Sequence, residues 1–176
     1  MIKIGTRRLL CGSAVAALAV AAGLVSSGPA RADTTITAAT TCTNPYTGSV
    51  VGPSSFDVNI PATSVVGDTV DVTVTFPFTN DSGYDLSDAN SFTEAITTTG
   101  TAENPVTVTA GSQGAIANGA TVTVTASGTW TPDEVRTATF TLGDFSFNIV
   151  AFGITVPVSC TFNSTPAAVS SVVSSS

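Results

Sequence analysis

The segment from Val70 to Asn80 constrains the fold most strongly, because apolar and polar residues alternate along it with a period of two. Its apolar positions are Val70, Val72, Val74, Phe76 and Phe78. This period places successive side chains on opposite faces of a β-strand. A strand with one apolar face needs a second layer of structure to cover that face, so the segment predicts a layered β-protein.

The same alternation recurs along the chain, between short clusters of turn residues. Further strands are expected at residues 34–41, 56–60, 92–99, 106–110, 122–130, 137–142, 145–151 and 154–162. Eight or nine short strands with almost no helical periodicity predict an all-β fold, an antiparallel β-sandwich of immunoglobulin-like type. A jelly roll or a closed barrel is the alternative, because the sequence does not give the strand order.

Two short segments between these strands carry their own signals. Gly143 and Asp144 predict a tight turn that separates two strands. The run Thr131-Pro132-Asp133-Glu134 has a capping threonine, a proline and early acids, which predict a single helical turn.

Residues 1–32 have the three parts of an export signal peptide. A basic start (Lys3, Arg7, Arg8) precedes an apolar run (Ala14 to Val25) and a cleavage motif (Ala30-Arg31-Ala32). Thr6-Arg7-Arg8 resembles the twin-arginine signature, and Sec export stays open as the other route. The protein is therefore expected to be secreted or held on the cell envelope, with no transmembrane segment in the mature chain that begins at Asp33.

Removal of the signal leaves a strongly acidic chain. Arg136 is then the one basic residue against twelve acids, which gives a formal charge of −11. A protein without lysine or histidine and with one arginine does not neutralise phosphates, so we expect no nucleic-acid partner. Cations, carbohydrates and basic proteins remain as possible ligand classes.

Two cysteines, Cys42 and Cys160, remain in the mature chain. Both fall on the apolar face of an expected strand, and a lone pair of cysteines in an exported protein predicts a disulfide. Closing so long a loop constrains the unfolded chain by about 4 to 5 kcal/mol on the chain-entropy model. A zinc site is the rival interpretation, but two thiols without histidine fall short of a ligand set.

Residues 33–163 are expected to form one domain, and residues 164–176 a disordered Ser-rich tail. The alternation assigns eight residues to the core: Val72, Val74, Phe76, Val122, Val124, Phe147, Ile149 and Val156. It places Thr73, Thr75, Thr123 and Thr125 on the outer face, where a β-branched hydroxyl residue favours the strand and contacts water.

The residue types exclude most catalytic chemistry. Triads that need an imidazole base and sites that need a lysine have no residues to build them. Two carboxylates can hydrolyse a glycoside, and the candidate pairs are Asp133 with Glu134 and Asp57 with Asp71. Because such acids more often face water, we expect no enzyme activity and no catalytic residues.

One loop, residues 80–88, concentrates acidic residues. Asp81, Asp85 and Asp88 offer the oxygen ligands that calcium prefers, with Gly83 to bend the chain. The alternative is a hydrated turn, since Asn, Asp, Ser and Gly are turn residues. Tyr84 in this loop and Trp130 could together stack against a sugar, although Trp130 at a strand end also suits core packing.

A few features of the whole chain also carry a family resemblance. They are the alanine-rich signal, Cys42 with a turn at Pro45, the strand pair around Pro61 and Gly67, and Cys160 near the close. In these the chain resembles the exported, threonine-rich all-β domains of unknown function common in actinobacteria. The resemblance implies an envelope or extracellular location and supplies no activity.

Two functions follow as hypotheses. The first is a non-enzymatic secreted or cell-envelope interaction or structural domain without a cofactor. The second is a calcium-supported carbohydrate-binding or adhesive module, in which Asp81, Asp85 and Asp88 hold the cation. An envelope protein or a glycan would be the partner.

Overall fold

A computed structural model describes residues 31–46, 48–99 and 105–175. Within these ranges all regular structure is β-strand. The strands are β1 (Arg31–Thr37), β2 (Thr40–Asn44), β3 (Gly48–Val51), β4 (Ser55–Pro61), β5 (Thr63–Val65), β6 (Val70–Thr79), β7 (Asp88–Thr99), β8 (Val106–Ala110), β9 (Thr121–Trp130), β10 (Thr137–Ala151), β11 (Ile154–Phe162) and β12 (Val169–Ser174). The all-β prediction is confirmed.

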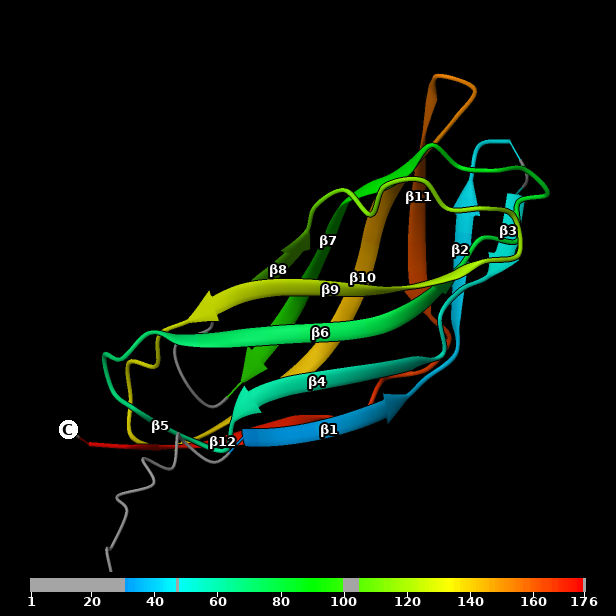
Figure 1. The fold of residues 1–176 in the computed structure, drawn as a ribbon. Helices are drawn as coiled ribbons and strands as arrows, with labels where there is room; N and C mark the ends of the chain where they lie inside the picture. Colours follow the sequence, from blue (N-terminus) through cyan, green and yellow to red (C-terminus); the bar gives the residue numbers. More distant parts are fainter. Residues whose placement is uncertain (1–30, 47, 100–104, 176) are drawn as a thin grey trace, which may run out of the picture.

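The strands form one hydrogen-bonded sheet that folds over into two layers. Their order is β1-β4-β6-β9-β8-β7-β10-β11-β2-β3, with β12 between β10 and β5. Strands β1, β4, β6 and β9 make a front layer, and β7, β10, β11 and β2 cross behind it (Figure 1). The antiparallel, sandwich-like architecture is as predicted. Its immunoglobulin-like form is not confirmed, because both layers belong to one continuous sheet.

A long bent hairpin closes this sheet on one side. Strands β1 and β2 follow each other along one arm, and β3 and β4 along the other. The arms stay paired through the bend, where the Ala38 N–H donates to Ser54 O and the Gly52 N–H donates to Thr40 O. A Cβ on Gly52 would lie 2.5 Å from Cys42 Sγ, so only glycine fits this corner. The strand expected at 34–41 is therefore two strands, one in each layer.

The core lies between the two layers and is rich in phenylalanine. Rings of Phe56, Phe76, Phe92 and Phe145 contact one another across it. Of the eight residues predicted to be buried, five are: Val72, Val74, Phe76, Val124 and Phe147. Val122 and Ile149 are half-buried against the core, and Val156 is half-buried as well. The register predicted for these strands is therefore correct.

The predicted disulfide between Cys42 and Cys160 is confirmed. Its S–S distance is 2.00 Å, and the two residues are separated by 118 positions in the sequence. They lie directly opposite each other on the neighbouring strands β2 and β11. The bond thus joins two strands of the rear layer, and does not join the two layers as in an immunoglobulin domain.

The prediction of a disordered tail is wrong for residues 169–174. Residues 169–174 form β12, which pairs antiparallel with β10 and parallel with β5. Val169 and Val173 are buried in the core, and Ser171 is buried beside Ser64, 3.3 Å between hydroxyl oxygens. The serine-rich composition concealed an alternating strand whose inner positions are apolar or small enough to pack.

Two predicted interruptions are also wrong. Gly143 and Asp144 form a β-bulge inside the continuous strand β10, where the register shifts between Leu142 and Phe145. The extra residue lets both Leu142 and Phe145 face the core. The helical turn predicted at 131–134 is absent from the described structure, where these residues make an irregular connection.

The predicted export signal falls almost wholly on residues 1–30, outside the described ranges. Arg31 and Ala32, its last two residues, pair with Pro61 and Ile60 at the start of β1. A chain that begins at Asp33 keeps five of the seven pairs between β1 and β4.

Candidate functional site

Two loops and one hairpin turn gather at one end of the sandwich, which we call the loop end. They are residues 80–88 after β6, residues 111–120 between β8 and β9, and the turn that joins β10 to β11 (Figure 1). Leu86 and Ile116 bridge the two loops, with backbone hydrogen bonds of 2.9 and 3.0 Å. Leu86, Ile116 and Ala89 form a small second core beneath them. The loop end is therefore a packed surface.

Asn80 is buried and connects the two loops. Its side-chain amide donates to Tyr84 O at 2.7 Å and to Ile116 O at 3.0 Å. Its side-chain oxygen accepts from the Ser82 N–H and hydroxyl. Because every polar atom of this side chain is used, Asn80 fixes the conformation of both loops.

Asp88 holds the second loop from its base. Its carboxylate accepts hydrogen bonds from the Asn90 amide, the Ser112 hydroxyl and the backbone N–H groups of Gln113 and Gly114. These bonds, that from Asn90 first, hold the pKa of Asp88 below its ordinary value. Asp88 thus fixes the turn at residues 112–114 through Oδ1 and binds Asn90 through Oδ2.

The calcium prediction finds no support in this geometry. Asp85 accepts the Asn118 N–H at 2.8 Å, while Asp88 is committed to the bonds of the 112–114 turn. Asp81 is exposed. In the ranges that the structure describes, no three acidic, cysteine or histidine side chains form a group that could hold a metal ion by themselves. The acidic loop is organised by its own hydrogen bonds.

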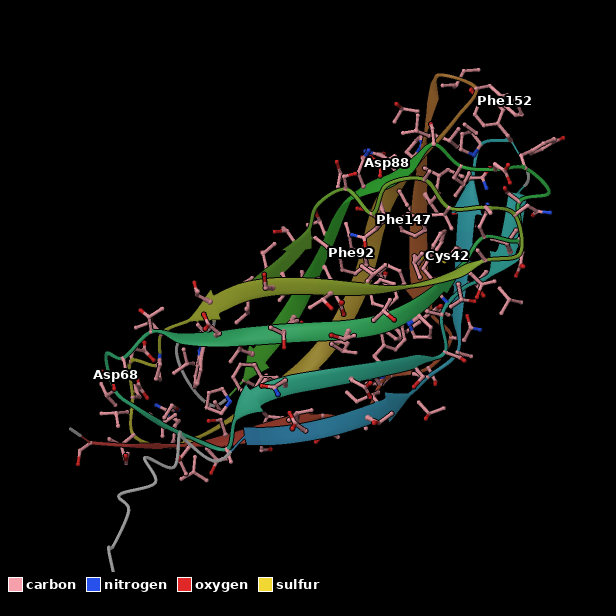
Figure 2. All side chains as sticks on the ribbon, in the orientation of Figure 1. Cys42, Asp68, Asp88, Phe92, Phe147 and Phe152 are labelled. Atoms are coloured by element: carbon pink, nitrogen blue, oxygen red, sulfur yellow. A yellow bond between two sulfur atoms is a disulfide. The ribbon has the colours of Figure 1, made fainter. Side chains whose placement is uncertain are left out.

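The loop end exposes two aromatic side chains next to its polar ones. Tyr84 is 58% exposed and Phe152 is 77% exposed. Their ring centroids lie 5.3 Å apart at an interplanar angle of 74°, an edge-to-face contact. Phe152 projects from the tip of the β10–β11 hairpin (Figure 2). We call these two residues the aromatic patch.

Phe152 has a backbone conformation that is unfavourable for phenylalanine. Phe152 and Gly153 have φ of +52° and +74° and form the two-residue turn between Ala151 and Ile154. Positive φ at both central positions defines a type I′ turn, which strongly prefers Asn-Gly. A phenylalanine there is strained and solvent-exposed at once. Sequence reasoning missed this residue, although Phe-Gly at a hairpin turn is the signal that could have found it.

Trp130 does not share the surface with Tyr84. It is 5% exposed and packs edge-to-face on Phe140, with ring centroids 4.8 Å apart. It ends β9, whereas the loop of residues 111–120 precedes that strand, so Trp130 lies at the opposite end of the sandwich (Figure 1). The core-packing interpretation of Trp130 is confirmed, and the aromatic partner of Tyr84 is Phe152.

Of the two candidate carboxylate pairs, Asp57 and Asp71 are too far apart for glycoside hydrolysis. Asp57 pairs with Thr75 of β6. Asp71 lies four residues before Thr75 on that strand, which is about 13 Å along the strand at the usual spacing. That exceeds the roughly 5 to 10 Å that such a mechanism uses. Glu134 forms an ion pair with Arg136, both on the exposed connection to β10.

The outer face of the sheet is mostly polar. One row of cross-strand partners through nine strands consists of Asp33, Asn59, Thr73, Ser127, Thr109, Thr93, Ser146, Ser159 and Thr43. A hollow of about 410 Å³ lies over this face at β1, β4 and β6. Its polar groups bond to one another, as Thr35 does to Asp57 at 2.7 Å. This face solvates the sheet, as the outward threonines predicted.

The core itself contains one ionisable side chain that sequence reasoning missed. Glu94 is 0% exposed on the inner face of β7, opposite Val108 on β8 and Phe145 on β10. Neither carboxyl oxygen has a hydrogen-bond partner among the described residues. Burial raises the pKa of Glu94 to about 8. The sequence did contain a signal that Glu94 points inward, because it lies between Phe92 and Ile96 at the apolar positions of an alternating segment.

No protein-family model matches the chain, and no curated protein matches it. The described residues form no helix of the length and apolarity needed to cross a membrane. The site must therefore be interpreted from its own chemistry.

Proposed function

We propose that this protein is a non-enzymatic, exported interaction domain that binds its partner through the loop end. The observation that carries this proposal is the aromatic patch. Of the nine phenylalanines, all of which lie in the described ranges, Phe152 alone is exposed. An exposed aromatic pair on a rigid base is typical of binding surfaces, where aromatic residues are enriched.

Strain at Phe152 supports the same interpretation. A non-glycine residue in the left-handed region costs about 1 to 2 kcal/mol, and an exposed ring recovers little of this by burial. Asparagine would form the same turn without that cost. A residue that is unfavourable for folding at an exposed tip is explained by what it contacts outside the chain.

Export is supported by the disulfide and by the signal features of residues 1–32. Disulfides persist in oxidising compartments, and Cys42–Cys160 is formed. A non-enzymatic role is supported by the lack of histidine in the chain and by the separation of Asp57 from Asp71. The polar outer sheet and the acidic surface keep such a domain soluble.

The test compares three forms of the full-length exported chain: the parent, Tyr84→Ala and Phe152→Asn. Each purified form is incubated with envelopes from the cells that export it, and the retained fraction is measured. We expect both variants to lose most retention while their circular dichroism and melting stay those of a folded domain. Equal retention of all three forms would rule out the loop end as the binding surface.

A carbohydrate-binding role is the second candidate, because Tyr84 presents an exposed ring beside two carboxylates. Sugars stack on aromatic faces and hydrogen-bond to carboxylates. In its calcium-supported form, this role needs a cation at Asp81 and Asp85. Glycan binding that requires Tyr84 and disappears with a chelator would establish it, and binding unaffected by a chelator would remove calcium from it.

A further inference from the structure

We propose that the aromatic patch binds a lysine- or arginine-bearing segment of a partner protein. This inference rests on the proposed function and names the chemistry of the partner. It is drawn from three features of the loop end: which polar groups are free, where the charges lie, and which rings are exposed.

Two carboxylates are among the polar groups left free in the loop that carries Tyr84. The Asn80 amide and the Ser82 hydroxyl are used within the loop, and Asn118 Oδ1 accepts the Gly83 N–H. Asp81 forms no hydrogen bond with the described residues, and Asp85 offers its second oxygen beyond the bond from Asn118. A ligand at the patch therefore meets hydrogen-bond acceptors that carry negative charge, and these prefer cationic donors.

The basic side chain of the mature chain lies at the end of the sandwich opposite the aromatic patch. In the chain expected to begin at Asp33, the one basic residue is Arg136, just before β10. Strand β10 runs for 15 residues from Arg136 to the Phe152 turn, a span on the order of 45 Å at strand spacing. That distance is several Debye lengths at physiological salt, so the negative potential at the loop end is not neutralised from there.

The exposed rings suit the same ligand. A lysine ammonium or an arginine guanidinium is attracted to the face of an aromatic ring. The alkyl stem of either side chain can pack on Phe152 while the charged head reaches a carboxylate. A neutral glycan would gain the stacking but not the charge, whereas a basic segment gains both.

The experiment uses the full-length exported chain and two synthetic probes. One is a ten-residue peptide of alternating lysine and glycine, and the other is the same peptide with every lysine acetylated. Calorimetric titration should give binding of the lysine peptide that weakens steeply with salt, and no binding of the acetylated peptide. We expect at least tenfold weaker binding for Tyr84→Ala, for Phe152→Asn and for Asp81→Asn with Asp85→Asn.

The matched control removes the same charge from the opposite end. Asp68 and Asp71 are exposed acids near the start of β6, far from Phe152 (Figure 2), and Asp68→Asn with Asp71→Asn should change affinity less than twofold. An equal loss in this control would mean that general acidity attracts the peptide, and would overturn the inference. Binding of the acetylated peptide would overturn it as well. If a glycan array gives Tyr84-dependent binding while the lysine peptide does not bind, the cationic partner is wrong and the interaction role stands.

Discussion

The two ends of this sandwich are closed by different means. At the β12 end, backbone hydrogen bonds join neighbouring segments, for example Val173 N–H to Arg136 O at 2.9 Å and Val66 N–H to Ser174 O at 3.0 Å. At the loop end, backbone bonds such as Leu86 N–H to Ile116 O are supplemented by buried and half-buried side chains, Asn80 and Asp88, that bond across to the facing loop. One end buries its aromatic residue, Trp130, while the other exposes Phe152.

This difference suggests that one end covers the core and that the other end recognises a partner. Extending the sheet with β12 covers the core and leaves little side chain free for recognition. Loops fixed by asparagine and aspartate leave their outer side chains available, because the atoms that hold the loop are not the atoms that face solvent. We therefore expect changes at the β12 end to act on stability and changes at the loop end to act on binding.

The largest expected effect is at the β12 end, from Val173→Asp. Val173 is 2% exposed in the core, and an unpaired charge there should cost about 4 kcal/mol or more and unfold much of the protein. Thermal melting followed by circular dichroism measures the change. The neighbouring Val172→Asp is the control, because Val172 is 54% exposed on the opposite face and should change little. Two harmless substitutions would mean that β12 does not contribute to the core.

The next effect concerns the core that both ends share. The pKa of Glu94 is about 8 in the folded protein against an ordinary value of 4.5. Between these values the folded state keeps a proton that the unfolded state has released, so stability falls as the pH rises through this window. The loss is about 1.4 kcal/mol per pH unit and on the order of 5 kcal/mol across the whole window.

Glu94→Gln should remove most of this pH dependence, because an amide does not ionise. Melting temperatures at pH 4.5, 6, 7.5 and 9 should diverge from the parent as the pH rises, with the variant the more stable at pH 9. Glu134→Gln, which changes an exposed acid, is the control and should follow the parent. Parallel curves for Glu94→Gln and the parent would show that Glu94 is ionised in the folded protein or is not buried.

A smaller and local effect is expected from Asn80→Ala. Removing the buried amide takes away one of the two donors of Tyr84 O and one of the two donors of Ile116 O, at a cost of about 2 kcal/mol. Hydrogen exchange should accelerate in residues 80–88 and 111–120 and stay unchanged at the Val173 amide. Uniform acceleration at both ends would contradict the independence of the two ends.

The smallest effect has the opposite sign. Phe152→Asn replaces a strained residue with one that favours positive φ, so the melting temperature should rise by a few degrees, for a gain of about 1 kcal/mol. Phe152→Ala is the control, since it removes the ring without favouring the left-handed conformation. Equal gains from both variants would attribute the effect to loss of the ring and not to the backbone.

Much of the fold could be predicted from the sequence. A strand that is buried on one face has apolar residues at every second position, and this alternation can be recognised in the sequence. The alternation located the strand at Val70 and the pairing of Cys42 with Cys160. The prediction failed at β12, where the serine-rich composition was given more weight than the alternation. Val169, Ser171 and Val173 are the buried positions of an alternating strand, but the serine among them was interpreted as a sign of disorder. Gly143 and Asp144 have turn composition, and whether such a pair turns or bulges depends on the neighbouring strand.

The candidate site was only partly predictable, because its parts meet through the fold. Tyr84 and the three aspartates were found as a cluster along the chain. The contacts of these residues could not be predicted. Asp88 bonds to a loop some 25 residues away in the sequence. Phe152 comes from a hairpin that no local sequence pattern places beside Tyr84. Carboxylates close in sequence predicted a shared cation, which stays a prediction; the sequence did not show that Asp85 and Asp88 accept backbone N–H groups of the facing loop.

The position of the disulfide also determines how the domain would carry mechanical force. Tension applied to β1 and β12 passes along the chain to Cys42, through the two sulfur atoms to Cys160, and on to β12. The 118-residue span between the cysteines is bypassed, and about 400 Å of contour length remains folded away from the load. While the bond is intact, only the short segments outside it can extend, so reduction would convert a nearly inextensible link into a long, compliant one.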